Sequence, residues 1–202
     1  ASVIREVVLG SGAGFPADVR VRPDLTYKAA STAKSEVNAP LRYIQDAMRL
    51  AEAQLAAKHC NADTLTIVDG PLSFEPARKG AALGYVKRLH QLYVPQSLLP
   101  MLASLPAGAR TPVFLIRPKS SGLTRYSWFQ RLAAPARGTI ELHGLVRLEA
   151  SETLGLDAAR TLANAAASWL PRLAPSRARD PRSPQNLLPI GALEQQLRKM
   201  SG

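Results

Sequence analysis

The chain alternates between short apolar runs and longer stretches whose apolar residues recur at helical spacing. The clearest run is Thr64–Val68, five β-branched or apolar residues. It ends at Asp69, which Gly70 and Pro71 follow. Such a run predicts a buried strand, and the Gly-Pro pair predicts that the chain turns directly after it. A carboxylate therefore stands at the end of a core strand.

A helix is predicted just before this strand. Asn38 is a suitable N-cap and Pro40 suits the first helical turn, so we expect a helix that begins after Asn38 and ends near His59. Apolar residues at helical spacing define the face that we expect to be buried. These residues are Leu41, Ile44, Met48, Ala51 and Leu55.

The rest of the chain continues the alternation of strands and helices. Further strands are expected over Val3–Leu9, Leu83–Lys87, Pro112–Arg117, Tyr126–Leu132 and Leu142–Ala150. Further helices are expected over Gln96–Ser104, Leu156–Leu170 and Leu187–Met200. Interleaved strands and helices indicate an α/β fold. We expect residues 1–170 to form the core, and residues 171–202 to form a basic connector and a C-terminal helix packed on it.

Composition narrows the class of protein. The 202 residues suffice for one sizeable domain, and 46% of them are hydrophobic. Lys and Arg outnumber Asp and Glu by 26 to 15, which favours phosphate-rich partners or acidic surfaces, although an ordinary solvated basic surface is also compatible. The single cysteine, Cys60, excludes an internal disulfide and fits a cytoplasmic protein. No apolar run is long enough to span a bilayer, so we expect no membrane association.

Asp69 is the first candidate for chemistry. In open α/β sheets functional groups gather at the carboxyl ends of strands. Asp-Gly pairs also form ordinary turns, and both interpretations of Asp69 stay open.

Glu52 is the second candidate. On a helical wheel it lies roughly 50–60° from the centre of the apolar stripe, which predicts that it faces the sheet. Two carboxylates near the end of one strand would hold a divalent cation through oxygen ligands, and such a cation activates water. The alternative is a half-exposed helix acid paired with Arg49.

Several motifs, taken in order, resemble one family. They are R-x-x-E (Arg49 and Glu52), VDGPL (68–72), GYVKRLHQLYVP (84–95), YSWFQRL (126–132), GLVRLE (144–149) and RSPQNLLPIGALEQQLR (182–198). Their order and spacing resemble the NurA nucleases, most of all an actinobacterial branch of that family. The core of these nucleases resembles RNase H and Piwi domains.

The resemblance implies an RNase H-like mixed sheet flanked by helices. It implies a nuclease that depends on Mn²⁺ or Mg²⁺ and works as a homodimer with a HerA-like hexameric ATPase in DNA end processing and repair. Glu52 matches the family's helical acid and Asp69 the acid of its second Asp-Gly motif. Both would be catalytic metal ligands.

Two parts of the family pattern have no match. The first Asp-Gly of the family has no counterpart here, so it lies upstream of Ala1 or is lacking. The late Tyr and His of the family are also missing, and the matching place holds Gln185, Asn186 and Leu193.

Two further charged residues follow predicted strands. Lys87, after the strand at 83–86, is a candidate to bind the scissile phosphate or to neutralise charge in the transition state; the alternative is a surface lysine. Glu149 is either a further metal-binding acid or an edge-strand acid paired with Arg147 or Arg131.

Basic and aromatic residues suggest a nucleic-acid surface. We expect phosphate contacts from Arg125, Arg131, Arg179 and Arg182. Tyr126, Trp128 and Phe129 are candidates to stack unpaired bases, but we favour a core position for at least one of them.

The favoured hypothesis is therefore a metal-dependent DNA nuclease. A non-catalytic nucleic-acid-binding or scaffolding relative of the same fold is the first alternative, and a basic α/β protein that docks on an acidic protein surface is the second.

Overall fold

The computed structural model describes residues 38–61, 64–72, 81–118, 122–134, 142–175 and 184–201. The chain divides into two compact units, Ala1–Glu52 and Ala53–Gly202, and each is considered by itself. The expected strand Val3–Leu9 lies outside the described residues, and so do Arg179 and Arg182.

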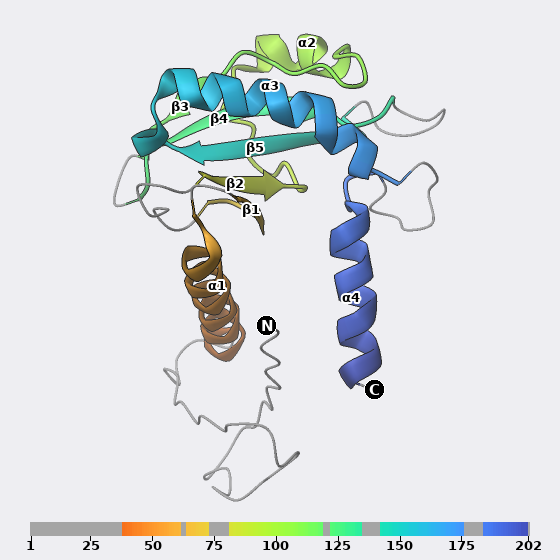
Figure 1. Cartoon of the computed structure of the whole chain (residues 1–202). Helices are drawn as coiled ribbons and strands as arrows, with labels where there is room; N and C mark the ends of the chain where they lie inside the picture. Colours follow the sequence, from red (N-terminus) through yellow and green to blue (C-terminus); the bar gives the residue numbers. More distant parts are fainter. Residues whose placement is uncertain are drawn as a thin grey trace, which may run out of the picture. The chain divides into compact units, whose positions relative to one another are not determined.

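A mixed sheet forms the centre of the second unit. Within the described residues its five strands are β1 (Leu65–Asp69), β2 (Ala81–Val86), β3 (Phe114–Ile116), β4 (Arg125–Arg131) and β5 (Leu145–Ser151), in the order β1-β2-β5-β4-β3 (Figure 1). β1 and β2 are parallel, and the other pairs are antiparallel. The predicted α/β class is confirmed. This arrangement is consistent with an RNase H-like fold but is not specific to it.

The described helices are α1 (Ala39–His59), α2 (Leu99–Ala103, after a 3-10 turn at Gln96–Leu98), α3 (Leu156–Leu173, after a 3-10 turn at Glu152–Leu154) and α4 (Leu188–Ser201). Each strand and helix predicted within the described ranges forms, with ends within three residues of the prediction. None of these helices is long and apolar enough to cross a membrane.

The C-terminal end of α3 lies beyond the predicted one. We expected the helix over Leu156–Leu170, but α3 continues through Pro171 to Leu173. Proline lacks an N–H and clashes with the preceding turn, which usually ends a helix. Here it stands in the last turn, and Ala174 N–H donates a closing bond to Pro171 O at 3.3 Å.

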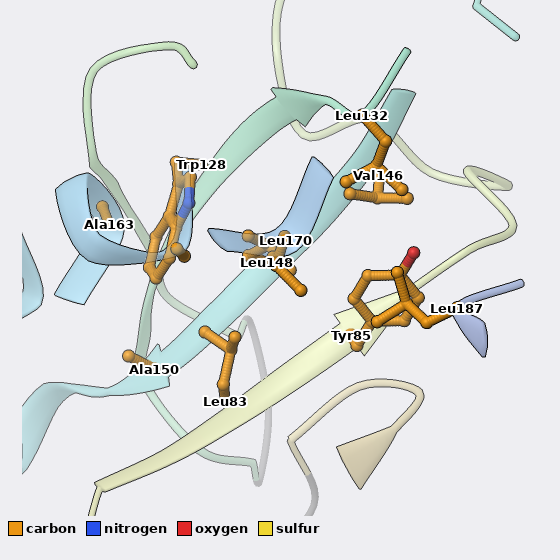
Figure 2. Packing of buried hydrophobic residues seen from close by; sticks show 11 residues of the cluster. Leu83, Tyr85, Trp128, Leu132, Val146, Leu148, Ala150, Ala163, Leu170 and Leu187 are labelled. Atoms are coloured by element: carbon orange, nitrogen blue, oxygen red, sulfur yellow. The ribbon is translucent and has the colours of Figure 1, made fainter. Parts of the chain in front are cut away.

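α3 and the sheet enclose the main core. Alternate residues of a strand face opposite sides of a sheet, and one side of β2, β4 and β5 contributes apolar residues to a cluster with α3. Figure 2 shows these side chains packed together, and the buried members are Leu83, Tyr85, Trp128, Leu132, Val146, Leu148, Ala150, Ala163, Ala166, Leu170 and Leu187. The alanines of α3 are small, which allows the helix to lie close to the strands.

A second cluster lies on the other face of the strands. Leu102 of α2 packs with Phe129 and Leu145, and the ring of Phe129 stacks on that of Phe114 with centroids 5.8 Å apart. Both faces of the sheet are therefore covered by apolar contacts. Trp128 and Phe129 are both fully buried, which confirms the core interpretation for these aromatic residues.

The predicted buried face of α1 is not found. Leu41 and Met48 of its apolar stripe are more than half exposed, and no described residue of α1 is buried. Helical spacing identifies which side of a helix is apolar but not what covers that side. Glu52 is itself exposed, so burial gives no support to the prediction that it faces the sheet.

Candidate functional site

The carboxyl ends of β1 and β2 place two predicted residues side by side. Because the strands are parallel, they end at the same edge of the sheet; Asp69 pairs in register with Tyr85, and Lys87 comes directly after β2. Lys87 Nζ lies 2.7 Å from Asp69 Oδ2. The Lys87 side chain is 15% exposed and that of Asp69 is 42% exposed, so solvent reaches this ion pair. We call Asp69 and Lys87 the strand-end pair.

The segment before α4 joins the strand-end pair. Lys87 Nζ also donates to Asn186 Oδ1 at 3.3 Å, and Asn186 is buried. Asn186 Nδ2 in turn donates to Glu194 Oε2 at 3.5 Å. Asn186 was noted in the sequence only as a departure from the family pattern. Glu194 was missed because nothing local shows that α4 begins next to the end of β2.

Tyr85 fixes the same segment from the α3 side. Its hydroxyl donates to Gln185 O at 2.7 Å. Burial raises the pKa of the Tyr85 phenol far above its ordinary value, and the negative charge of Asp69 raises it further. The phenol therefore stays protonated and keeps donating its hydrogen bond.

The chain after Asp69 crosses over β2 at a glycine. Gly70 N–H donates to Tyr85 O at 2.9 Å, and Gly70 has φ 130°, a conformation that favours glycine. A Cβ on Gly84 would lie 2.8 Å from Leu72 N and 3.1 Å from Gly70 O. Gly84 thus lets the backbone pass close over the strand.

Glu149 of β5 receives this crossing segment. It is fully buried, and its Oε2 accepts Leu72 N–H at 2.9 Å. Its Oε1 lies 2.9 Å from Arg147 Nη2 and 3.2 Å from Arg125 Nε. The pairing with Arg147 was one of the predicted alternatives, but the second partner is Arg125 and not Arg131. Among the described strands β5 is also central and not at an edge. Because two cations and an N–H already occupy its carboxylate, Glu149 has no role as a metal ligand in this arrangement.

Arg131 does not lie where a phosphate contact requires. It is fully buried, and its guanidinium donates to the carbonyls of Leu102, Ala103, Leu105 and His143. Burial lowers the pKa of this guanidinium. The predicted DNA contact of Arg131 is not compatible with this position, where the side chain instead ties the α2 segment to the loop before β5. The Arg125 side chain is 18% exposed, and its Nε lies 3.2 Å from Glu149 Oε1. Most of this side chain is therefore also buried, with its charge paired inside the protein.

A basic hollow lies between α3 and the segment that precedes β3. An open cavity of about 580 Å³ is lined by Arg110, Pro112, Val113, Arg160 and Asn164. Arg110 Nε donates to Asn164 Oδ1 at 3.1 Å, which joins this part of the chain to α3.

No cluster of three or more His, Cys, Asp or Glu side chains suited to a metal occurs among the residues that the structure describes. Of the two predicted metal ligands, Asp69 belongs to the second unit and Glu52 to the first, so no distance joins them. Asp69 and Asn186 do offer a carboxylate and an amide oxygen around one ammonium, that of Lys87.

Comparison with known proteins does not assign this chain to a family. A scan against protein-family models found no match, and a search of curated proteins found none.

Proposed function

We propose that this chain is a metal-dependent DNA nuclease of the NurA type, which hydrolyses phosphodiester bonds in DNA end processing. The strand-end pair is the observation that carries the proposal. A solvent-accessible carboxylate and an ammonium lie 2.7 Å apart at the carboxyl ends of two parallel strands, the place where α/β proteins position functional groups. The formal charge of +11 suits a polyanionic substrate.

The donor chemistry at this place fits a hard divalent cation. The Asp69 carboxylate is the ligand type that Mn²⁺ and Mg²⁺ prefer, and because Lys87 contacts the Asp69 Oδ2 and the Asn186 Oδ1, the Asp69 Oδ1 is the oxygen left for an ion. Asp69 would hold the ion, and the resemblance to the NurA nucleases gives Glu52 the role of a further ligand; when bound, the ion supplies water activation and neutralises phosphate charge.

Lys87 would bind the substrate. Its ammonium is oriented by Asp69 on one side and by Asn186 on the other, which positions a fixed positive charge at the strand ends. Such a charge binds a non-bridging phosphate oxygen and stabilises the negative charge that grows there during attack. Tyr85, held protonated by burial, keeps Gln185 and so its neighbour Asn186 in place.

Cleavage of end-labelled single- and double-stranded DNA in Mn²⁺, Mg²⁺ or EDTA tests the proposal. The variants are Asp69→Asn, Glu52→Gln and Lys87→Met. The matched control is Asp157→Asn, because Asp157 is an almost fully exposed acid on α3. We expect cleavage only with metal, a loss of about 100-fold or more in the three site variants, and no change in the control. Cleavage in EDTA, or cleavage that Asp69→Asn leaves intact, would overturn the proposal.

The proposed setting is a cytoplasmic homodimer that works with a HerA-like hexameric translocase. The resemblance of the motifs to the NurA family supports it. Size-exclusion chromatography with light scattering, on the chain alone and mixed with such an ATPase, measures both associations.

A non-catalytic nucleic-acid-binding or scaffolding relative is the second candidate. The observation that favours it is the departure from the family pattern, because Gln185, Asn186 and Leu193 stand at the place of the family's late Tyr and His. The DNA cleavage assay described above distinguishes the two candidate functions. A scaffold would bind DNA without cutting it in any metal, and Asp69→Asn would leave that binding unchanged.

A further inference from the structure

Tyr93 has an unusual backbone conformation. Among the described residues it is the one non-glycine residue with positive φ, at 60°. Bulky side chains rarely adopt this conformation, and it persists only where the surroundings enforce it. Strained residues of this kind occur often at binding sites.

A buried arginine supports the Tyr93 ring. The Arg147 guanidinium carbon lies 4.7 Å from the ring centroid, and Arg147 is itself held by Glu149 and by the carbonyl of Gln91. Tyr93 nevertheless remains 41% exposed. A cation over the face of an aromatic ring fixes its orientation. The ring is therefore held firmly from one side and reaches solvent.

The segment that carries Tyr93 begins in the candidate site. Lys87 belongs to the strand-end pair, and the exposed residues Arg88 and His90 follow it. Tyr93 is six residues beyond Lys87, so the chain places it within roughly 20 Å of Lys87. Basic residues together with an exposed ring are the features with which proteins bind single strands, because the charge follows the phosphates and the ring stacks on a base.

We propose that Tyr93 is a stacking platform for an unpaired base, with Arg88 contacting the adjacent backbone. Single-stranded DNA is then the substrate class of the strand-end site. The inference rests on the proposed nuclease function and specifies its substrate. A duplex offers Tyr93 no free base to stack on, because its bases already stack on one another.

Binding of a fluorescent single-stranded oligonucleotide in EDTA, measured by anisotropy, tests this inference without cleavage. Tyr93→Asn removes the ring, and asparagine tolerates positive φ well. We expect about 10-fold weaker binding to single strands, little change for a duplex of the same sequence, and recovery in Tyr93→Phe. Arg88→Gln should weaken binding and reduce the salt dependence by about one phosphate contact. Tyr43→Ala is the control, because Tyr43 is an exposed tyrosine on α1.

A second measurement does not depend on the stability of the Asn variant. In Tyr93→Trp the added indole should be quenched by single-stranded DNA and not by duplex, after subtraction of the wild-type signal from Trp128 and Trp169. Absence of this quenching, or equal single-strand affinity in a folded Tyr93→Asn protein, overturns the role of Tyr93 alone. Failure of the wild-type protein to bind any DNA overturns the proposed function as well.

Discussion

At the scale of the residue, Glu149 joins three parts of the structure next to the site. One buried carboxylate is bound by Arg147, by Arg125 and by the N–H of Leu72. Desolvation makes such a charge costly unless each partner is present, so removing one charge leaves the others buried without compensation. Its contribution is thus to hold the segment after Asp69, not to bind a metal.

Glu149→Gln tests this contribution. We expect the free energy of unfolding in urea to fall by about 3–5 kcal/mol, because two largely buried guanidinium groups lose their counter-ion. Glu152→Gln is the matched control: Glu152 is exposed in the 3-10 turn that follows β5, and its change should stay within about 0.5 kcal/mol. Similar effects of the two substitutions would contradict the role given to Glu149.

The raised pKa of Tyr85 predicts that the free energy of unfolding decreases at alkaline pH. Its pKa is raised in the folded state, so the stability it contributes is complete below the unfolded pKa of about 10 and declines as the pH rises above that value. Above pH 10 the decline should approach about 1.4 kcal/mol per pH unit for this group. Tyr85→Phe should lose about 1 kcal/mol at pH 7 with the hydrogen bond to Gln185, and its stability should fall less steeply above pH 10. Parallel profiles for the two proteins would refute this assignment.

The sequence predicts some of these residues and not others, for a physical reason. Asp69 and Lys87 are identifiable because a strand end is a local feature of sequence. Arg131 is not, because both faces of the sheet are covered and alternation along β4 cannot separate an inward arginine from an outward one. Tyr93 was missed because its support, Arg147, lies 54 positions further along the chain.

At the scale of the element, two glycines are expected to respond oppositely to the same change. A Cβ on Gly84 would lie 2.8 Å from the backbone of Leu72, so Gly84→Ala should displace the crossing segment and cost about 1–3 kcal/mol. Gly191, inside α4, has only Asn186 Nδ2 at 3.6 Å, an ordinary contact. Gly191→Ala should stabilise the protein by about 0.5–1 kcal/mol. Urea unfolding measures both, and a neutral Gly84→Ala would show that the crossing is loosely packed.

The helices and strands themselves are easier to predict than which of them lie next to one another in space. Each described strand and helix follows from the spacing of apolar residues, capping residues and turn residues, which are local properties. The position of β5 between β2 and β4 is not local, nor is the attachment of the segment before α4 to Lys87 through Asn186. The apolar stripe of α1 shows the same limit, because its spacing is helical but its burial depends on other parts of the chain.

At the scale of the whole molecule, the charge of +11 predicts a strong effect of salt on DNA binding. Three phosphate contacts would give a slope near −2.7 in a plot of log affinity against log salt, so binding should weaken by about 40-fold between 50 and 200 mM salt. Sucrose at matched osmolality is the control and should have little effect. Salt-independent binding would assign the basic surface to another partner, such as an acidic protein.

The place of β5 in the sheet also affects how the protein is made. β5 is the last of the described strands along the chain, yet within the described sheet it is the strand that connects the β1–β2 pair to the β3–β4 pair. Two-stranded units are marginally stable by themselves. A nascent chain therefore carries Asp69 and Lys87 out of the ribosome long before it can build the sheet that holds them. Folding must wait until residues 145–151 emerge, and for several seconds at ordinary rates of synthesis the earlier strand edges stay exposed to chaperones and to other chains.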